Sequence, residues 1–543
     1  MIVITRSEIH DNTFLIRSIW TVIAIIISFS FALDTVAAED KRPDVVIAVN
    51  TLPRTLEPSE ITGNIEVRVF YSLFDTLIRR DFINQIPGEA PKLMPSLAKS
   101  WRRIDDRTLE VTIRPGVKFH NGDILSADDV VFTFSKERLW GKKSLSRRGR
   151  NHFGMLKEVS KIDAHTVRFT TKHPDPLLEQ KLTGYTAWVV NARSWLKYKS
   201  DKPDWLKIAL DANRWNPVGT GPLKFNQREP GKEISFIAHD AYFMGKQNFG
   251  TLTFKEVPDR VGRMAGLIGG KFDIIVDIAP ERIGVLDKYP NIEARSVLLD
   301  NSHVLAFNTN SSKLRDKRLR QALSLAIDRK ALRKTLWLNR NFTPNGHQLE
   351  SFGKMYNAKR PGYVYDVEKA KRLLKESGYK GELISYRIVR DYYLNSENAA
   401  LMIIDMWRQI GIQAKLELVD NFKAARGKGV EIYAWSNTIR LPDPVGGLMV
   451  SWGPRSSIQT KYKFWTPTSK FNDFSNVILT SGDADQRYKA FQHALDIFES
   501  EMPGTILYNP LYTYGVKRGI NWTPYSIYFM DFRPDVFSFQ PRK

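Results

Sequence analysis

The chain has 543 residues, of which 42% are hydrophobic and 26% are charged, a composition typical of a globular protein that buries a large core. It contains no cysteine, which excludes disulfides, thiolate metal sites, cysteine nucleophiles and a lipid-modified cysteine anchor. The formal net charge of +22 favours anionic partners such as acidic ligands and membrane surfaces.

The N-terminus has the pattern of a secretory signal. Arg6 and Arg17 precede an apolar run over residues 19–33, and small residues follow at Val36, Ala37 and Ala38. The run is shorter than the roughly 20 residues that span a bilayer. We therefore predict a signal peptide over residues 1–38, cleaved after Ala38, and a mature protein free in a bacterial periplasm. Since a secreted chain rarely meets nucleic acid and its basic residues are scattered, no nucleic-acid partner is expected.

The first elements of the mature chain can be assigned from local patterns. Residues 44–49 are apolar enough for a buried strand, and residues 109–113 alternate as a half-buried strand does. A helix is predicted to start at Ser126, because Ser is a preferred N-cap and Asp128 and Asp129 then lie in the first turn.

Later elements alternate between helix and strand. Helices are predicted over residues 316–332, 366–378 and 398–410, the last two ending at a glycine, and a strand follows over residues 413–419. This alternation favours α/β lobes.

The usual motifs of catalysis are missing. No Gly-Lys pair is followed by Ser or Thr, no His is followed by Glu, and there is no G-x-S-x-G or EF-hand pattern. The sequence therefore predicts no enzyme, no catalytic residues, no cofactor and no metal site. A triad assembled from distant residues stays open, so a secreted hydrolase is one alternative.

Several segments carry a resemblance to a known family. They are PSLAKSW at 95–101, RPGVKFHNG at 114–122 with SADDVVF at 126–132, PVGTGP at 217–222, FNT at 307–309 with RLRQAL at 318–323 and AIDR at 326–329, MWRQIGI at 406–412, and PDP at 442–444. In this order and spacing they resemble the family 5 bacterial extracellular solute-binding proteins, the peptide and nickel class that feeds ABC importers.

The resemblance implies an α/β fold of the two-lobed periplasmic-binding-protein type (class II), with an extra domain in the first lobe. Closure of such lobes around a ligand is a hinge motion. The expected boundaries are residues 39–80, 205–305 and 505–543 for lobe I, 81–204 for the extra domain, and 306–504 for lobe II.

The resemblance also implies ligand contacts near Arg390. Dipeptide-binding members have an Arg at this spacing that holds the terminal carboxylate of the peptide, and a planar guanidinium suits that task. Tyr392 is expected to line the pocket beside Arg390.

A second contact region is expected over residues 435–444. Trp435 could stack on a ligand or belong to the core. Peptide binders usually have an Asp here that pairs with the ligand's ammonium. Thr438 occupies the place of this Asp when positions are counted forward from Trp435, and Arg440 occupies it when they are counted back from the PDP segment at 442–444. An Arg would favour a carboxylate, a phosphate or a sugar hydroxyl. Asp443 is interpreted as a capping residue.

The function implied is that of the periplasmic substrate-binding component of an ABC importer. This protein would act as a monomer that captures a peptide or peptide-like ligand and delivers it to an inner-membrane permease with a separate ATPase. Whether the ligand carries an anionic group is left undecided by the sequence. An opine, an oligosaccharide or a metal chelate on the same fold is the alternative ligand.

Overall fold

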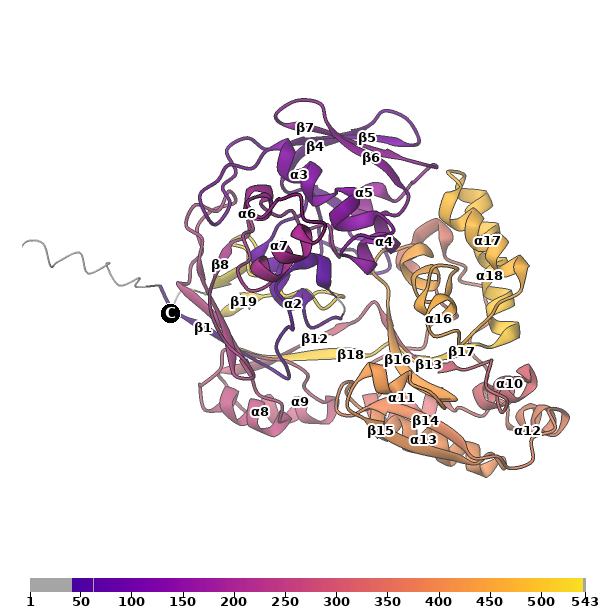
Figure 1. Cartoon of the computed structure of the whole chain (residues 1–543). Coiled ribbons are helices and arrows are strands. Elements are labelled where there is room, and N and C mark those ends of the chain that lie inside the picture. Colours follow the sequence, from indigo (N-terminus) through magenta and orange to yellow (C-terminus); the bar gives the residue numbers. More distant parts are fainter. Residues whose placement is uncertain (1–41, 62, 541–543) are drawn as a thin grey trace, which may run out of the picture. The chain divides into compact units, whose positions relative to one another are not determined.

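The computed structural model describes residues 42–61 and 63–540, and the predicted signal peptide lies outside them. Residues from Asp44 onward form one unit, and its elements are labelled in Figure 1. In the described part of the chain, no helix is both long and apolar enough to cross a membrane.

A seven-stranded sheet organises the first lobe, in the order β12-β18-β11-β1-β10-β9-β8. Its strands are β1 (Val45–Val49), β8 (Leu223–Glu229), β9 (Glu233–Ala238), β10 (Thr251–Glu256), β11 (Ile274–Ile275), β12 (Ile292–Leu298) and β18 (Leu511–Lys517). The central strand β1 pairs in parallel with β10 and β11, and four of its five residues are fully buried. Helices α8 (Arg260–Ile268) and α9 (Ile283–Leu286) pack near its β12-β18-β11 side.

A four-stranded antiparallel sheet, β4-β5-β7-β6, lies between β1 and β8 in sequence. Its strands are β4 (Ala98–Arg103), β5 (Thr108–Ile113), β6 (Leu156–Lys161) and β7 (Thr166–Thr171), and α3 (Ala127–Thr133) packs on β6 and β7. The alternation read in the sequence is confirmed, since Leu109, Val111 and Ile113 are buried. Ser126 and Asp129 form the capping box that starts α3.

Shorter elements complete the first lobe. They are α2 (Val67–Leu73), β2 (Ile78–Arg80), β3 (Leu93–Pro95), α4 (Arg147–Phe153), α5 (Leu178–Lys181), α6 (Ala192–Leu196), α7 (Trp205–Asn213), β19 (Ile520–Trp522) and β20 (Phe537–Phe539). Strands β2 and β3 pair with each other, as do β19 and β20.

A five-stranded sheet organises the second lobe, in the order β15-β14-β16-β13-β17. Its strands are β13 (Asn301–Phe307), β14 (Ile384–Val389), β15 (Ala414–Val419), β16 (Ile432–Thr438) and β17 (Gly504–Tyr508). Its helices are α10 (Lys317–Leu325), α11 (Arg329–Trp337), α12 (Val367–Glu376), α13 (Ser396–Gln409), α14 (Phe422–Ala425), α15 (Val450–Trp452), α16 (Ser457–Thr460), α17 (Ser469–Thr480) and α18 (Ala484–Glu501). Helix α13 packs on β14 and β15, and α17 lies along α18 (Figure 1).

One predicted helix, over residues 316–332, is interrupted in the structure. Asp328 accepts a hydrogen bond from the amide of Ala331 and caps a new helix, α11. The buried guanidinium of Arg329 bonds to the carbonyl oxygens of Ser324 and Ile506, which fixes the turn between α10 and α11. The prediction of one continuous helix was wrong because one of these partners, Ile506, lies far outside the segment from which the helix was predicted.

The two large sheets are joined by two short links that lie together. β12 leads into β13 through Leu299 and Asp300, and β17 leads into β18 through Asn509 and Pro510. The amide of Leu299 bonds to the carbonyl of Pro510 at 3.2 Å, and the Asn509 side chain bonds to the carbonyl of Leu299 at 3.3 Å. Strands β13 and β17 belong to the second sheet but cross the boundaries expected at 305/306 and 504/505. A pair of short links of this kind is suited to hinge motion between the lobes.

The hinge contains a carboxyl group whose ionisation should lower stability. Burial raises the pKa of Asp300 to about 6, although Ser526 and Arg80 oppose the shift. In an unfolded chain an Asp has a pKa of about 3.9, so the folded chain retains this proton to higher pH. The contribution of Asp300 to stability is therefore complete below about pH 4 and is lost as the pH rises to about 6.

We expect the substitution Asp300→Asn to raise the free energy of unfolding at pH 8 by on the order of 3 kcal/mol, and to change it little at pH 4. Urea unfolding at several pH values measures this difference, with the exposed Asp287→Asn as the control. A gain of the same size at pH 4 and pH 8 would contradict the explanation by ionisation.

Candidate functional site

A cavity opens between the two lobes and encloses about 520 Å³ of empty space, including solvent at its mouth. From the first lobe it is lined by Asn50, Asn64, Ile65, Arg68, Asp277 and Tyr512, among others. From the second lobe it is lined by His303, Trp337, Tyr392, Tyr393 and Leu394. Clefts of this kind between lobes are common sites for small ligands.

Arg68 supplies the positive charge among the first-lobe residues that line this cavity. It lies in α2 and is 6% exposed. Its Nη1 donates to Asn50 Oδ1 at 3.1 Å and its Nη2 to the Tyr512 hydroxyl at 2.9 Å. Its Nε is buried and has no hydrogen-bond partner among the described residues. Burial acts to lower the pKa of Arg68, but Tyr512, Tyr514 and Asp277 outweigh it and raise that pKa, so the side chain is a permanent cation with one N–H to offer.

Asp277 is the acidic residue that lines the cavity, and its carboxylate already interacts with two arginines. It follows β11 with a left-handed backbone (φ 66°). Its carboxylate accepts from Arg260 Nε at 3.2 Å and lies 3.8 Å from Arg263 Nη2, both on α8. Two arginines therefore face one carboxylate here, and together with Arg68 they leave this wall basic.

The second-lobe wall is aromatic and uncharged. The Tyr392 and Tyr393 rings meet edge to face at 4.7 Å, and the Tyr393 hydroxyl accepts from the amide of Ser436 at 3.1 Å. Burial lowers the pKa of His303 to about 3, so its ring is neutral at neutral pH. Such a wall can stack on rings or on peptide planes.

The predicted site residues are distributed unequally around this cavity. Tyr392 lines it. Thr438, at the end of β16, is buried, and its Oγ1 accepts from Asn64 Nδ2 at 3.2 Å across the two lobes. Arg390 follows β14, is exposed, and lies outside the lining of the cavity in this conformation.

The other two predicted residues lie elsewhere. The half-buried Trp435 ring is stacked between Tyr433 at 5.6 Å and Trp452 at 5.5 Å, inside an aromatic cluster of the second lobe. Arg440 lines a separate, smaller cavity, where its guanidinium lies 4.8 Å from the ring centre of Tyr185.

Sequence reasoning missed Arg68, Asp277 and Tyr393. A signal did exist for the first, because Arg68 is the one charged residue in the otherwise apolar or uncharged run VRVFYSL. A charge in a fully buried helix needs a specific reason. The partners that explain it, Asn50 and Tyr512, could not be identified from the local sequence.

Within the described ranges, no group of three His, Cys, Asp or Glu side chains is placed to hold a metal ion. The polar groups of the cavity are instead hydrogen-bond donors and acceptors on fixed elements. Such an arrangement can hold a polar ligand by charge, hydrogen bonds and stacking.

Comparison with known families gives a match over most of the chain. The family described as "Bacterial extracellular solute-binding proteins, family 5 Middle" matches residues 92–458. The dipeptide-binding protein of Escherichia coli K12 is 26% identical over 442 residues, covering 77% of this chain and 81% of that protein. Heme-binding protein A of Haemophilus influenzae is 27% identical over 440 residues, covering 75% and 77%.

Solved structures share the fold. DppA from Helicobacter pylori, in complex with the peptide STSA, has a TM-score of 0.78 at 21% identity, covering 90% of this chain and 98% of that one. MoaA from A. tumefaciens R10, in complex with mannopinic acid, has a TM-score of 0.78 at 20% identity, covering 92% and 100%. The predicted two-lobed α/β fold is thereby confirmed.

Proposed function

Because the chain belongs to the family 5 bacterial extracellular solute-binding proteins, we propose that it captures a small peptide or peptide-like solute and delivers it to an ABC importer. The importer would consist of an inner-membrane permease and a separate ATPase, and the protein would act as a periplasmic monomer after loss of its signal peptide. Relatives named for dipeptides, and a similar structure that holds a tetrapeptide, support this choice of ligand.

The observation that carries the proposal is the cavity between the lobes, with the unpartnered Nε of Arg68 on one side and a tyrosine wall on the other. A terminal carboxylate would accept from Arg68, and the tyrosine rings would pack on peptide planes. Tyr392 is proposed to contact the ligand directly. We propose Arg390 as a contact at the rim, Thr438 as a closure contact through Asn64, and Trp435 as a support for the aromatic wall.

The same groups could hold another small anion-bearing molecule. A structurally similar protein is described in complex with mannopinic acid, which favours an opine as the second candidate. We rank oligosaccharides and metal chelates after peptides and opines as candidate ligands. We propose that the bound solute leaves chemically unchanged, so that the protein is not an enzyme.

A ligand screen tests the proposal. Purified protein is mixed with di- and tripeptides, opines and oligosaccharides, and its melting temperature is followed; a ligand at about 100 times its Kd stabilises by about 2.7 kcal/mol. We expect peptides to raise the melting temperature and to be recovered intact by mass spectrometry. If opines alone stabilise the protein, the proposed ligand is an opine and not a peptide. Recovery of cleaved peptide would indicate a hydrolase.

A further inference from the structure

A second, smaller cavity lies where the first lobe meets the loop after β16. It has about 190 Å³ of empty space when open solvent is counted, so an anion enters it only as the lining side chains move apart. Arg80 at the end of β2, His152 on α4, Gln180 on α5 and Tyr185 line it from the first lobe, and Arg440 lines it from the second. We call it the Arg80–Arg440 pocket.

Polar atoms without partners are concentrated in this pocket. Arg80 Nε, Arg440 Nε, His152 Nε2, Gln180 Oε1 and the Tyr185 hydroxyl are all buried and have no hydrogen-bond partner in the described part of the chain. Arg80 is 5% exposed and His152 is 8% exposed. Folded proteins leave few buried polar groups unsatisfied, and several around one small cavity indicate a missing ligand or ion.

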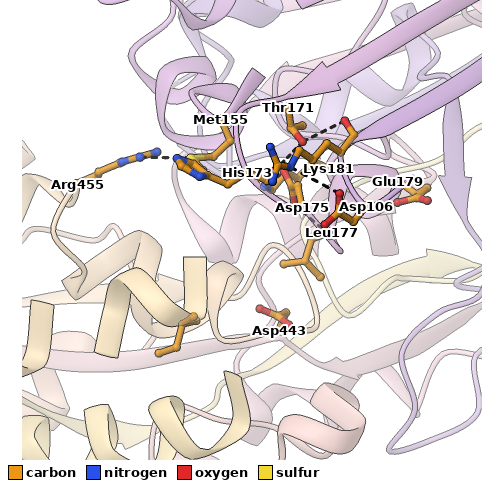
Figure 2. Close-up of polar contacts among 12 residues, drawn as sticks. Asp106, Met155, Thr171, His173, Asp175, Leu177, Glu179, Lys181, Asp443 and Arg455 are labelled. Atoms are coloured by element: carbon orange, nitrogen blue, oxygen red, sulfur yellow. Dashed lines mark hydrogen bonds and ion pairs between the residues drawn. The ribbon is translucent and has the colours of Figure 1, made fainter. Parts of the chain in front are cut away.

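Two of the nearby acids cannot neutralise the arginines, because they already form ion pairs with other residues. Lys181 holds Asp175 at 2.5 Å on the first lobe (Figure 2). On the second lobe Arg487 holds both oxygens of Asp443, at 2.8 and 2.9 Å. Neither Arg80 nor Arg440 forms an ion pair among the described residues.

The remaining acid is Asp300, which attracts Arg80 from a distance. Its Oδ2 accepts from the Ser526 hydroxyl at 2.8 Å. The His152 ring is neutral, because burial lowers its pKa to about 3. The pocket therefore contains two guanidinium groups without an ion-pair partner in the described chain, a neutral imidazole, a phenol, the Gln180 amide and the paired Lys181 ammonium, so its lining is positively charged.

The backbone that presents Tyr185 is unusual. Tyr185 and Thr186 have φ angles of 39° and 82°, in the left-handed region that side chains rarely adopt. The Tyr185 ring receives the Arg440 guanidinium on its face, which orients Arg440 toward the first lobe. Non-glycine residues persist in such conformations where the surrounding structure fixes them, often beside a ligand.

We propose that the Arg80–Arg440 pocket binds an oxyanion, with Arg80 donating from the first lobe and Arg440 from the second. The chemistry fits a carboxylate, phosphate or sulfate group, because planar guanidinium groups bind two oxygens of such groups well. Since the anion contacts both lobes, it favours the arrangement in which the lobes meet.

The oxyanion has two sources that this chemistry does not separate. It is either a charged group on the imported solute or free inorganic phosphate or sulfate. For the first source the inference rests on the proposed function, and for the second it stands alone.

Calorimetry with matched probes tests the pocket. Inorganic phosphate, inorganic sulfate and the dipeptides Ala-Glu and Ala-Gln are titrated into the wild-type protein and the variants Arg440→Gln, Arg440→Lys and Arg80→Gln. The control is Arg372→Gln, which changes an exposed arginine on α12. Melting temperatures without ligand establish that each variant is folded.

The wild-type protein is expected either to bind phosphate or sulfate alone, or to bind Ala-Glu about tenfold or more tightly than Ala-Gln, the lower end for a hydrogen bond to a charged group. Arg440→Gln and Arg80→Gln remove that preference, Arg440→Lys retains part of it, and Arg372→Gln leaves it intact. Binding of the inorganic anion identifies a free-ion site, and discrimination between the dipeptides identifies a group on the solute.

Two results would overturn the inference. One is the absence of both effects in the wild-type protein, and the other is a preference that persists in both glutamine variants. Failure of the proposed function is recognised separately. If phosphate binds but no peptide does, the anion-binding pocket is supported and the proposal of a peptide ligand is contradicted. If Ala-Glu and Ala-Gln bind equally well and neither inorganic anion binds, the peptide ligand is supported and the pocket proposal is wrong.

Discussion

Replacing Asp443 with asparagine is expected to lower the free energy of unfolding by about 3–5 kcal/mol, the range for removing one partner of a buried ion pair. Both oxygens of Asp443 accept from Arg487 Nη2, and both side chains are 6% exposed. The variant keeps the shape of the side chain but leaves the Arg487 charge buried without a counter-charge. Urea unfolding at pH 7, followed by tryptophan fluorescence, measures the loss.

The direction of the Asp443 pKa is consistent with this expectation. Burial raises the pKa of the carboxyl, and Arg487 and the Val445 amide only partly reverse the shift. The pair as a whole is therefore not the source of the stability, because burying two charges costs about as much as their attraction returns. What costs stability is the removal of one charge alone.

A double variant separates these two effects. Asp443→Asn combined with Arg487→Met removes both charges, and it should recover much of the stability lost by Asp443→Asn alone. The control Asp405→Asn breaks an exposed pair with Arg408 and should cost less than about 1 kcal/mol. A loss below about 1 kcal/mol for Asp443→Asn would mean that Arg487 finds another partner or water.

Asp443 also shows what a local pattern can predict. Its Oδ1 accepts from the amide of Val445 at 2.9 Å, so the interpretation as a capping residue is confirmed. The caps at Ser126 and Asp366 and the glycine at the end of α12 were predictable for the same reason, because each depends on residues within one turn. The break between α10 and α11 was not, because Arg329 is held by residues more than 170 positions away.

The residues of the cavity also differ in whether the local sequence could predict them. Tyr392 could be placed because the resemblance to peptide binders put it beside Arg390, and in the structure it lies three residues after β14 and lines the cavity. Arg68 could not be placed, because its partners Asn50 and Tyr512 are 18 and 444 positions away and meet it only through the fold. The order of family segments identifies the fold, whereas the charges of the cavity depend on contacts within the first lobe between residues far apart in the sequence.

The second large effect is expected at Arg68. Replacing it with methionine, which fills much of the same volume, should weaken binding of the best peptide from the screen by about 1.5–3 kcal/mol. The reason is the loss of a buried, charged donor in the cavity, whose Nε has no partner within the protein as described. Isothermal titration calorimetry at neutral pH measures this loss.

Arg390→Ala is the matched comparison, because both arginines are candidates for the ligand carboxylate. Arg390 is exposed, and an exposed ion pair contributes about 0–1 kcal/mol. We therefore expect a smaller loss there than at Arg68. Arg68→Lys should fall between wild type and Arg68→Met, since an ammonium keeps the charge but lacks the planar fork of the guanidinium.

The result also depends on what Arg68 does in the empty protein. Arg68→Met leaves the Asn50 amide oxygen and the Tyr512 hydroxyl without their donor, so its unfolding free energy must be measured as well. A variant that unfolds like the wild type but binds weakly places Arg68 against the ligand. If Arg390→Ala weakens binding more than Arg68→Met does, the carboxylate lies near β14, outside the lining of the cavity, and Arg68 only supports the site.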